Sequence, residues 1–220
     1  MSSLLLAGDG TLADLATYVA RAHRVDPGGA ARLVARGEVL AAYVSPVHGG
    51  GGPTVIGLRV LRLARGADLD TTVPLAALAA RFARLPTAAS AASGAPVELA
   101  LPPAQAVGVS WAGMAPPQSG WQVLGAVSRE LLQDSARQGV EEVVQGTPDG
   151  AGAGVVVRLR AKVWGRDLPG VAGVPAGAAY AAEALGFVGA DEPVALLASG
   201  PWRRLTTSRG HVLTRTSLMG

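Results

Sequence analysis

The sequence predicts an α+β fold in which antiparallel meander sheets pack against helices. Apolar residues recur at helical spacing over residues 12–24 and 75–85, whereas three short apolar runs near the C-terminus are separated by turns containing Ser and Gly. Hydrophobic residues fill 49% of the 220 positions, mostly as Ala, Val and Leu, which is enough to form a packed core of small side chains.

The N-terminal half is predicted to contain two helices and three strands. They are helix 12–24, strands 31–35, 38–44 and 54–63, and a second helix that Pro86 ends. Arg36 and Gly37 are expected to form the turn of a hairpin between the first two strands, and the glycine loop 49–52 to connect them with the third. Thr72 is expected to cap the second helix, with Pro74 in its first turn.

The C-terminal half is predicted to begin with a strand and to end in a three-strand meander. In order, we expect strand 97–101, an amphipathic helix with apolar positions from Leu124 to Val143, strand 155–164, helix 175–186, and strands 194–198, 202–206 and 211–215. Over 155–164, apolar residues alternate with Arg158, Arg160 and Lys162, which favours a half-exposed strand. A helix over these residues is the alternative.

The best candidate for a linker lies near the middle of the chain. Residues 87–95 carry no charge and no large apolar side chain, so we expect residues 87–96 to separate an N-terminal half, 1–86, from a C-terminal half, 97–220. The alternative is that the two halves form one compact domain.

Two similar segments suggest an internal repeat. Tyr18 and Tyr180 each begin the pattern Tyr-x-Ala-x-Ala, and each is followed after a short gap by an apolar run that ends in Gly37 or Gly200. The pattern is typical of a duplicated unit of one helix and three strands. The alternative is coincidence, because Ala-rich helices and Gly turns arise easily in this composition.

The composition excludes several kinds of chemistry and favours the cytoplasm. Cysteine is absent, which excludes disulfides, thiolate metal ligands and a Cys nucleophile. Residues 1–10 contain no basic residue ahead of their short apolar run, unlike a signal peptide. The longest apolar stretch, 171–190, is interrupted by Pro175 and Glu183, so we expect no membrane span.

Motifs that resemble catalytic or cofactor sites lack the context that those sites need. Residues 8–13 match the GxGxxA pattern of dinucleotide-binding proteins, but a predicted antiparallel hairpin follows them where a parallel strand is required. Residues 108–112 resemble a nucleophile elbow, but Pro116 and Pro117 lie where its helix would begin. His23, His48 and His211 are scattered. We therefore predict no catalytic residue, cofactor or metal site.

Three segments resemble a known group of proteins. TLADLATYVARAHRVD (11–26), GVPAGAAYAAEALGF (173–187) and PWRRLTTSRGHVL (201–213) are similar to segments of uncharacterised conserved proteins of high-GC bacteria. That group has no assigned function, so the resemblance implies no activity, cofactor or partner.

The leading hypothesis is a non-enzymatic cytoplasmic protein that binds another protein or a second copy of itself. Two tryptophans in a Pro-containing loop could form an exposed recognition surface, and a sheet edge is a second candidate. The candidate loop residues are Trp111, Met114, Pro116, Pro117 and Trp121. The alternative for the loop is that both tryptophans only anchor it to the core.

The second hypothesis is a nucleic-acid-binding module at the C-terminal end. Residues 155–220 hold eight basic and four acidic residues, a net charge of +4, and the final hairpin could place its arginines on phosphates. The candidate residues are Trp202, Arg203, Arg204, Arg209 and Arg215. The alternative is that these arginines protect a sheet edge from aggregation.

A third hypothesis, an enzyme, would need dispersed carboxylates such as Asp68, Asp70, Glu141 and Glu142 to meet in a pocket.

Overall fold

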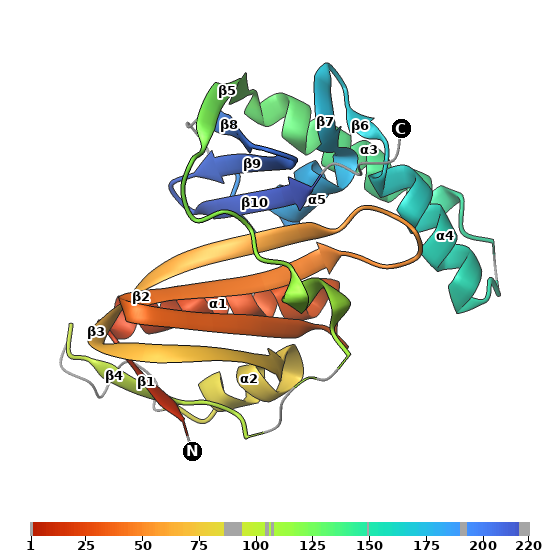
Figure 1. Ribbon diagram of the computed structural model, residues 1–220. Coiled ribbons are helices and arrows are strands. Elements are labelled where there is room, and N and C mark those ends of the chain that lie inside the picture. The colour runs from red at the N-terminus through yellow and green to blue at the C-terminus, as the bar shows by residue number, and fades with distance from the viewer. Residues whose placement is uncertain are drawn as a thin grey trace. The chain divides into compact units, whose positions relative to one another are not determined.

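The computed structural model describes residues 2–85, 94–103, 106, 108–148, 150–189 and 193–215. The chain forms two compact units: Met1–Val44 with Leu58–Gly113, and Ser45–Gly57 with Met114–Gly220. Both contain helices and antiparallel strands, which confirms the predicted α+β class (Figure 1). The predicted linker, 87–96, falls mostly on residues outside the described part, and residues 97–113 group with the first unit.

The first unit consists of part of an eight-stranded sheet with two helices, and it contains β2 as far as Val44 and β3 from Leu58. Its elements are β1 (Ser3–Leu6), α1 (Asp9–Val25), β2 (Ala30–Val47), β3 (Val55–Pro74), α2 (Leu75–Phe82), β4 (Val97–Ala100) and a 3-10 helix, Ser110–Gly113. The strand order is β4-β1-β3-β2, and β1 pairs antiparallel with both of its neighbours. Helix α1 packs against α2 and buries Leu15, Tyr18 and Val19. The prediction of the first helix is confirmed.

The predicted turn at Arg36 and Gly37 is wrong, because β2 is one continuous strand. Gly37 lies within it at a φ of +55°, a left-handed conformation that glycine adopts without the strain of a side chain. Gly66 of β3 comes close to Gly37, since a Cβ at position 66 would stand 3.5 Å from the Gly37 carbonyl carbon. Ion pairs bridge β2 and β3 on both sides of Gly37, Arg32–Asp70 before it and Glu38–Arg62 after it, so β2 continues past a signal that resembles a turn.

The glycine loop at 49–52 makes the turn between β2 and β3, as predicted. Gly49, Gly50 and Gly51 have φ values of +77°, +64° and +77°, which side-chain-bearing residues rarely adopt in succession. Thr72 is part of β3 and does not cap α2, which begins at Leu75 after Pro74. The rigid ring of Pro74 suits a position that ends a strand and opens a helix.

The second unit combines part of the eight-stranded sheet with three helices and a small hairpin, and it includes residues 45–57, the adjoining ends of β2 and β3. Its elements are β5 (Gln122–Val127), α3 (Arg129–Gln145), α4 (Ala153–Trp164), β6 (Asp167–Leu168), β7 (Val171–Pro175), α5 (Ala176–Ala184), β8 (Val194–Ser199), β9 (Trp202–Thr207) and β10 (Gly210–Arg215). The strand order is β10-β9-β8-β5, antiparallel throughout. The terminal meander and the helix after Pro175 are therefore confirmed.

One predicted element of the second unit is wrong, and the amphipathic helix is confirmed but begins later than predicted. Leu124 and Val127 lie in β5, and α3 begins only after Ser128, whose Oγ accepts a hydrogen bond from the Leu131 backbone N–H at 3.2 Å. Residues 155–164 are helical, although a strand was favoured. The neighbours Val163 and Trp164 are both buried, whereas adjacent residues of a half-exposed strand face opposite sides.

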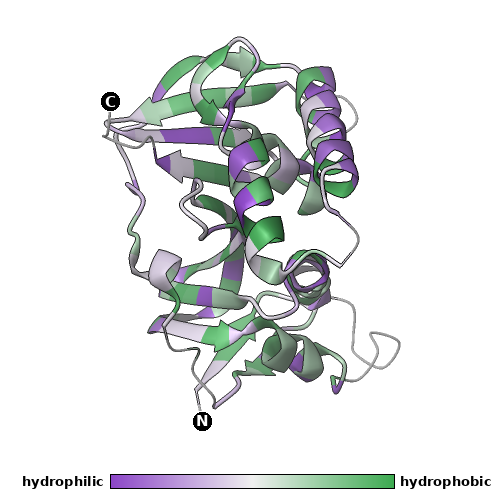
Figure 2. Cartoon of the chain, turned by 90° about the vertical axis from the view of Figure 1, so that its right-hand side faces the viewer, coloured by the Kyte–Doolittle hydropathy of each residue, from purple (hydrophilic) through white to green (hydrophobic). Residues whose placement is uncertain are grey.

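Trp164 holds the three helices of the second unit together. Its side chain is 2% exposed, and its ring stacks on Tyr180 of α5 with centroids 4.5 Å apart. On α3, a Cβ at Gly139 would stand 2.2 Å from the Trp164 ring, so the absence of a side chain there lets the helices approach. The helices carry both hydrophilic and hydrophobic residues along their length, as expected for elements with one buried face (Figure 2).

One face of β10 packs closely against the residue Phe187, which follows α5. A Cβ at Gly210 would stand 2.5 Å from the ring of Phe187, which follows α5. Leu205 of β9 and Val212 of β10 pair directly, lie on the same face as Gly210, and are buried. Their neighbours Arg204 and Leu213 therefore belong to the other face of the sheet.

Replacing Gly139 with Ala should destabilise the protein. The new methyl group would overlap the Trp164 ring, and overpacking of this kind costs about 1–3 kcal/mol even though Ala favours a helix over Gly. Gly154→Ala on α4 is the matched control, because a Cβ there meets only the Arg158 guanidinium at 3.7 Å. That variant should be neutral or gain up to about 1 kcal/mol. Urea denaturation of both variants provides the measurement, and equal stabilities would contradict the packing described for Trp164.

Asp70→Asn should weaken the first unit at neutral pH but not in acid. Arg32 donates hydrogen bonds to both Asp70 oxygens, at 2.9 and 2.7 Å, and this hydrogen bonding lowers the pKa of Asp70. A lowered pKa gives stability that is present above the unfolded-state pKa and is lost as the pH falls through the folded-state value. Because the Asp70 side chain is 40% exposed, we expect a loss of no more than about 1 kcal/mol at pH 7.

The difference between wild type and Asp70→Asn should shrink once the pH falls below about 4. Asp68→Asn is the control, because the Asp68 side chain, paired with Arg36, is 85% exposed and should contribute less than about 0.5 kcal/mol. Thermal unfolding of the three proteins across the acid range provides the measurement. A constant difference at all pH values would show that the carboxylate charge of Asp70 is not what stabilises the unit.

Candidate functional site

The two tryptophans of the predicted recognition loop lie in different units. Trp111 is in the 3-10 helix of the first unit, and its side chain is only 3% exposed, so it is part of that unit's core. Trp121 belongs to the second unit and is partly exposed, as are Met114, Pro116 and Pro117. Of the two aromatic rings, only Trp121 is therefore accessible to a partner.

Trp121 contacts Arg204, a residue of the other predicted site. The Arg204 guanidinium carbon lies 4.5 Å from the centroid of the Trp121 ring, a cation–π geometry, and the Trp121 Nε1–H donates to the Pro117 carbonyl at 3.0 Å. Burial lowers the pKa of the Arg204 guanidinium. Trp121 immediately precedes β5, so this contact fixes the point at which the chain enters the sheet.

The remaining basic residues of the final hairpin do not share one surface. Arg203 donates from Nη1 to the carbonyls of Gly200 and Trp202, at 3.2 and 3.1 Å, and lies on the opposite face of β9 from Arg204. Arg209 and Arg215 are exposed, and Trp202 is 7% exposed. Nucleic-acid binding by this hairpin stays a prediction.

The edge of β5 is the most exposed apolar feature of the second unit's sheet. Every residue from 122 to 126 is exposed, with Val123 at 72% and Leu124 at 56%. A β-bulge between Val123 and Gly125 leaves Leu124 opposite no residue of β8, and Gly125 adopts a φ of +153°. Both apolar side chains are therefore exposed to solvent.

This edge lacks the charged residues and prolines that commonly protect sheet edges. Residues 122–128, Gln-Val-Leu-Gly-Ala-Val-Ser, include no charge and no proline, whereas edge strands are commonly guarded by both. In the first unit, the edge strand β4 contains Glu98, and β2 contains Arg36 and Glu38. Within the described residues, no strand pairs with the outer side of β5.

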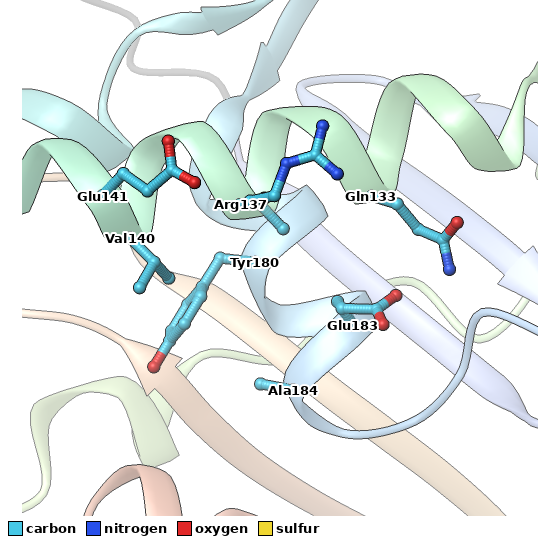
Figure 3. A pocket seen from close by; sticks show the side chains of 8 residues that line it. Gln133, Arg137, Val140, Glu141, Tyr180, Glu183 and Ala184 are labelled. Atoms are coloured by element: carbon cyan, nitrogen blue, oxygen red, sulfur yellow. The ribbon is translucent and has the colours of Figure 1, made fainter.

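A groove between α3 and α5 is the second candidate site. It has a volume of about 630 Å³ and is lined by Gln133, Ala136, Arg137, Val140 and Glu141 of α3 and by Tyr180, Glu183 and Ala184 of α5. Figure 3 shows Tyr180 beside Val140, and Glu183 on the α5 side of the groove. Val140 is 42% exposed, and Val144, one turn further along α3, is 68% exposed.

Of the charged residues that line the groove, the arginine has an ion-pair partner and the two glutamates have none among the described residues. Arg137 donates from Nη2 to Asp134 at 2.7 Å, so its charge is balanced on the same helix. Glu141 and Glu183 form no ion pair with any residue that the structure describes. The groove therefore combines an apolar floor with two carboxylates, one from each helix.

The four dispersed carboxylates named from the sequence do not meet. Asp68 and Asp70 pair with Arg36 and Arg32 in the first unit. In the second unit, Glu142 accepts hydrogen bonds from Arg166 at 2.5 and 2.6 Å. Only Glu141 lines the groove, while Glu183 and Tyr180 were not named as site residues. The spacing of Val140 and Val143 indicated an apolar face of α3 but not that Val140 would be exposed.

Two of the three histidines lie within hydrogen-bonding distance of a nearby residue. His48 Nδ1 lies 2.9 Å from the Ser45 carbonyl oxygen, and His211 Nδ1 lies 3.1 Å from Thr206 Oγ1. Over the described ranges, no three His, Cys, Asp or Glu side chains gather closely enough to hold a metal ion. None of the helices in the same ranges is long and apolar enough to cross a membrane.

Comparisons with known proteins identify two families of unknown function. Residues 1–112 match a family model described as Domain of unknown function (DUF8010), and residues 116–219 match one described as Domain of unknown function (DUF8185). No curated protein matches the chain. The two matched ranges meet near residue 113, where the first compact unit ends.

Among solved structures, the chain is similar to a DnaN sliding clamp (DNA polymerase III subunit beta) from Bartonella birtlesii, solved bound to griselimycin. The alignment covers 100% of this chain and 66% of the clamp chain, with 15% sequence identity and a TM-score of 0.46. A likeness of this size supports no conclusion about function.

Removing the Trp121–Arg204 contact should cost stability in a way that a double-mutant cycle can isolate. We expect Trp121→Leu and Arg204→Met to show a coupling of about 0.5–1 kcal/mol in urea denaturation, the usual size of a cation–π contact. Trp121→Leu with Arg203→Met is the control cycle and should be additive, because Arg203 lies on the opposite face of β9. Additivity in both cycles would mean that the contact does not hold β5 in place.

Proposed function

This chain belongs to the family described as Domain of unknown function (DUF8010), a description that names no activity, and we propose that the protein acts by self-association through β5. The observation that carries the proposal is the exposed pair Val123 and Leu124 on an uncharged sheet edge. Exposed apolar residues at an unprotected edge are where proteins form contacts with other chains.

A second copy of the chain is the partner that fits this surface best. Association about a twofold axis places the same residues on both sides of the contact, so a charged strand would meet its own charge. Residues 122–128 carry none, which lets two β5 strands approach without repulsion. The apolar side chains of the two copies, Val123 and Leu124 in each, would then bury one another away from water.

The Trp121–Arg204 contact holds the start of β5 in place. It anchors the residue before β5 on the central strand β9, so the edge is presented by a fixed scaffold. A rigid surface loses less conformational entropy on binding than a loop that must first be ordered. The bulge at Leu124 limits continuous strand pairing, and the side-chain contact is therefore expected to contribute most of the affinity.

The double variant Val123→Lys with Leu124→Lys tests the proposal. Light scattering after size exclusion should show a dimer for the wild type and a monomer for the variant, because two lysines per copy would meet their own charges across the axis. Val144→Lys is the matched control, since Val144 is 68% exposed on α3 and lies outside β5, and it should remain dimeric. The circular dichroism spectrum should be unchanged in both variants, while the Tm of the β5 variant should lose the dependence on protein concentration that dimerisation gives the wild type.

A wild-type protein that stays monomeric at every concentration up to its solubility limit would overturn the proposal. So would a Val144→Lys variant that dissociates to the same extent as the β5 variant. The alternative prediction, nucleic-acid binding, would gain support from salt-dependent retention of DNA or RNA that is lost in Arg209→Ala with Arg215→Ala. Those two arginines are the exposed members of the predicted basic site.

A further inference from the structure

We infer that the groove between α3 and α5 binds a small organic cation with an apolar body, such as an alkylammonium ion. The groove lies within the second unit, and its lining residues differ from those of the β5 edge. The inference therefore does not depend on self-association.

The apolar part of the groove suits the body of such a ligand. Ala136, Val140 and Ala184 supply aliphatic surface, and the volume of about 630 Å³ falls within the range of small-molecule sites, about 300–1,000 Å³. Val140 is 42% exposed, although an apolar side chain on a helix usually faces the core. A ligand that covers Val140 would remove that surface from water.

The aromatic ring in the groove is held in place before any ligand arrives. Tyr180 stacks on Trp164 at a centroid distance of 4.5 Å and an interplanar angle of 19°, and Trp164 is itself 2% exposed. The face of an aromatic ring attracts cations, because its π electrons carry partial negative charge. A ring fixed by stacking offers that attraction without the entropic cost of ordering a free side chain.

The charges of the groove select a cation. Glu141 from α3 and Glu183 from α5 bring carboxylates from both walls, and neither has an ion-pair partner within the described residues. Arg137, the basic residue in the lining, is paired with Asp134 at 2.7 Å. An anionic ligand would meet two uncompensated negative charges here, whereas an ammonium group would be attracted by both.

Three ligands with the same hexyl chain separate charge from apolar contact. Hexylammonium, hexanol and hexanoate are titrated into the isotopically labelled full-length protein, and backbone NMR shifts report which residues each ligand affects. We expect hexylammonium to bind most tightly, hexanol more weakly and hexanoate weakest, with shifts centred on α3 and α5. Added salt should weaken hexylammonium binding and leave hexanol binding unchanged.

Substitutions in the groove identify the groups that recognise the cation. Glu141→Gln and Glu183→Gln should each weaken hexylammonium binding by about twofold to fivefold, the usual range for exposed charge pairs, and leave hexanol binding unchanged. Glu130→Gln makes the same charge change on α3 outside the groove lining and should change neither. Tyr180→Phe keeps the ring that stacks on Trp164 and should retain binding.

Equal affinity for the three ligands would overturn the inference, as would a charge preference that Glu130→Gln reduces as much as Glu141→Gln does. Absence of shifts on α3 and α5 would overturn it as well. Repeating the titration with the Val123→Lys, Leu124→Lys variant separates the two proposals, because the groove should keep its affinity whether or not the protein associates.

Discussion

The indole of Trp164 determines how closely three helices of the second unit can pack. It ends α4, stacks on Tyr180 of α5, and fills the space that Gly139 of α3 leaves open. At Gly177 of α5 a Cβ would stand 3.1 Å from the Trp164 Cβ, so small residues surround this side chain on two helices. Because α3 and α5 form the walls of the groove, the same packing that stabilises the core also fixes the width of the candidate binding site and the orientation of its aromatic ring.

The bulge in β5 limits how far another strand can pair with this exposed edge. A long, flat and apolar edge strand would act as a template for pairing with many other strands. In β5 the register shifts between Val123 and Gly125, which interrupts the ladder after a few residues while both Val123 and Leu124 remain exposed. In the proposed association, a short surface of this kind would be covered by one further copy, since a twofold contact closes on itself and leaves no free end.

The sequence could predict the elements whose stabilising signals are local. The first helix, the helix after Pro175 and the terminal meander follow from spacing and turn residues that lie within each segment. The strand predicted for 155–164 is wrong, although apolar and basic residues do alternate there. The segment is a helix, and its Trp164 packs against residues of α3 and α5 that the local pattern does not reveal. The contacts of the candidate sites could not be predicted for the same reason. Trp121 and Arg204 were each singled out, but their contact depends on the pairing of β5, β8 and β9, and the groove depends on two helices that the sequence does not place together.

The net charge of the chain, +3, does not indicate what its surfaces attract. In the first unit, Arg32, Arg36 and Arg59 pair with Asp70, Asp68 and Asp14, so these positive charges are largely compensated before any partner approaches. Glu141 and Glu183 are not compensated, and the α3–α5 groove is therefore negative in a protein that is positive overall. At about 10 Å and beyond, salt screens the average charge of the protein, whereas groups within the groove act on a ligand at contact distance. The local balance of paired and unpaired charges therefore says more about each surface than the net charge does: β5 carries no charge that a second copy would oppose, and the α3–α5 groove carries two carboxylates without an ion-pair partner among the described residues.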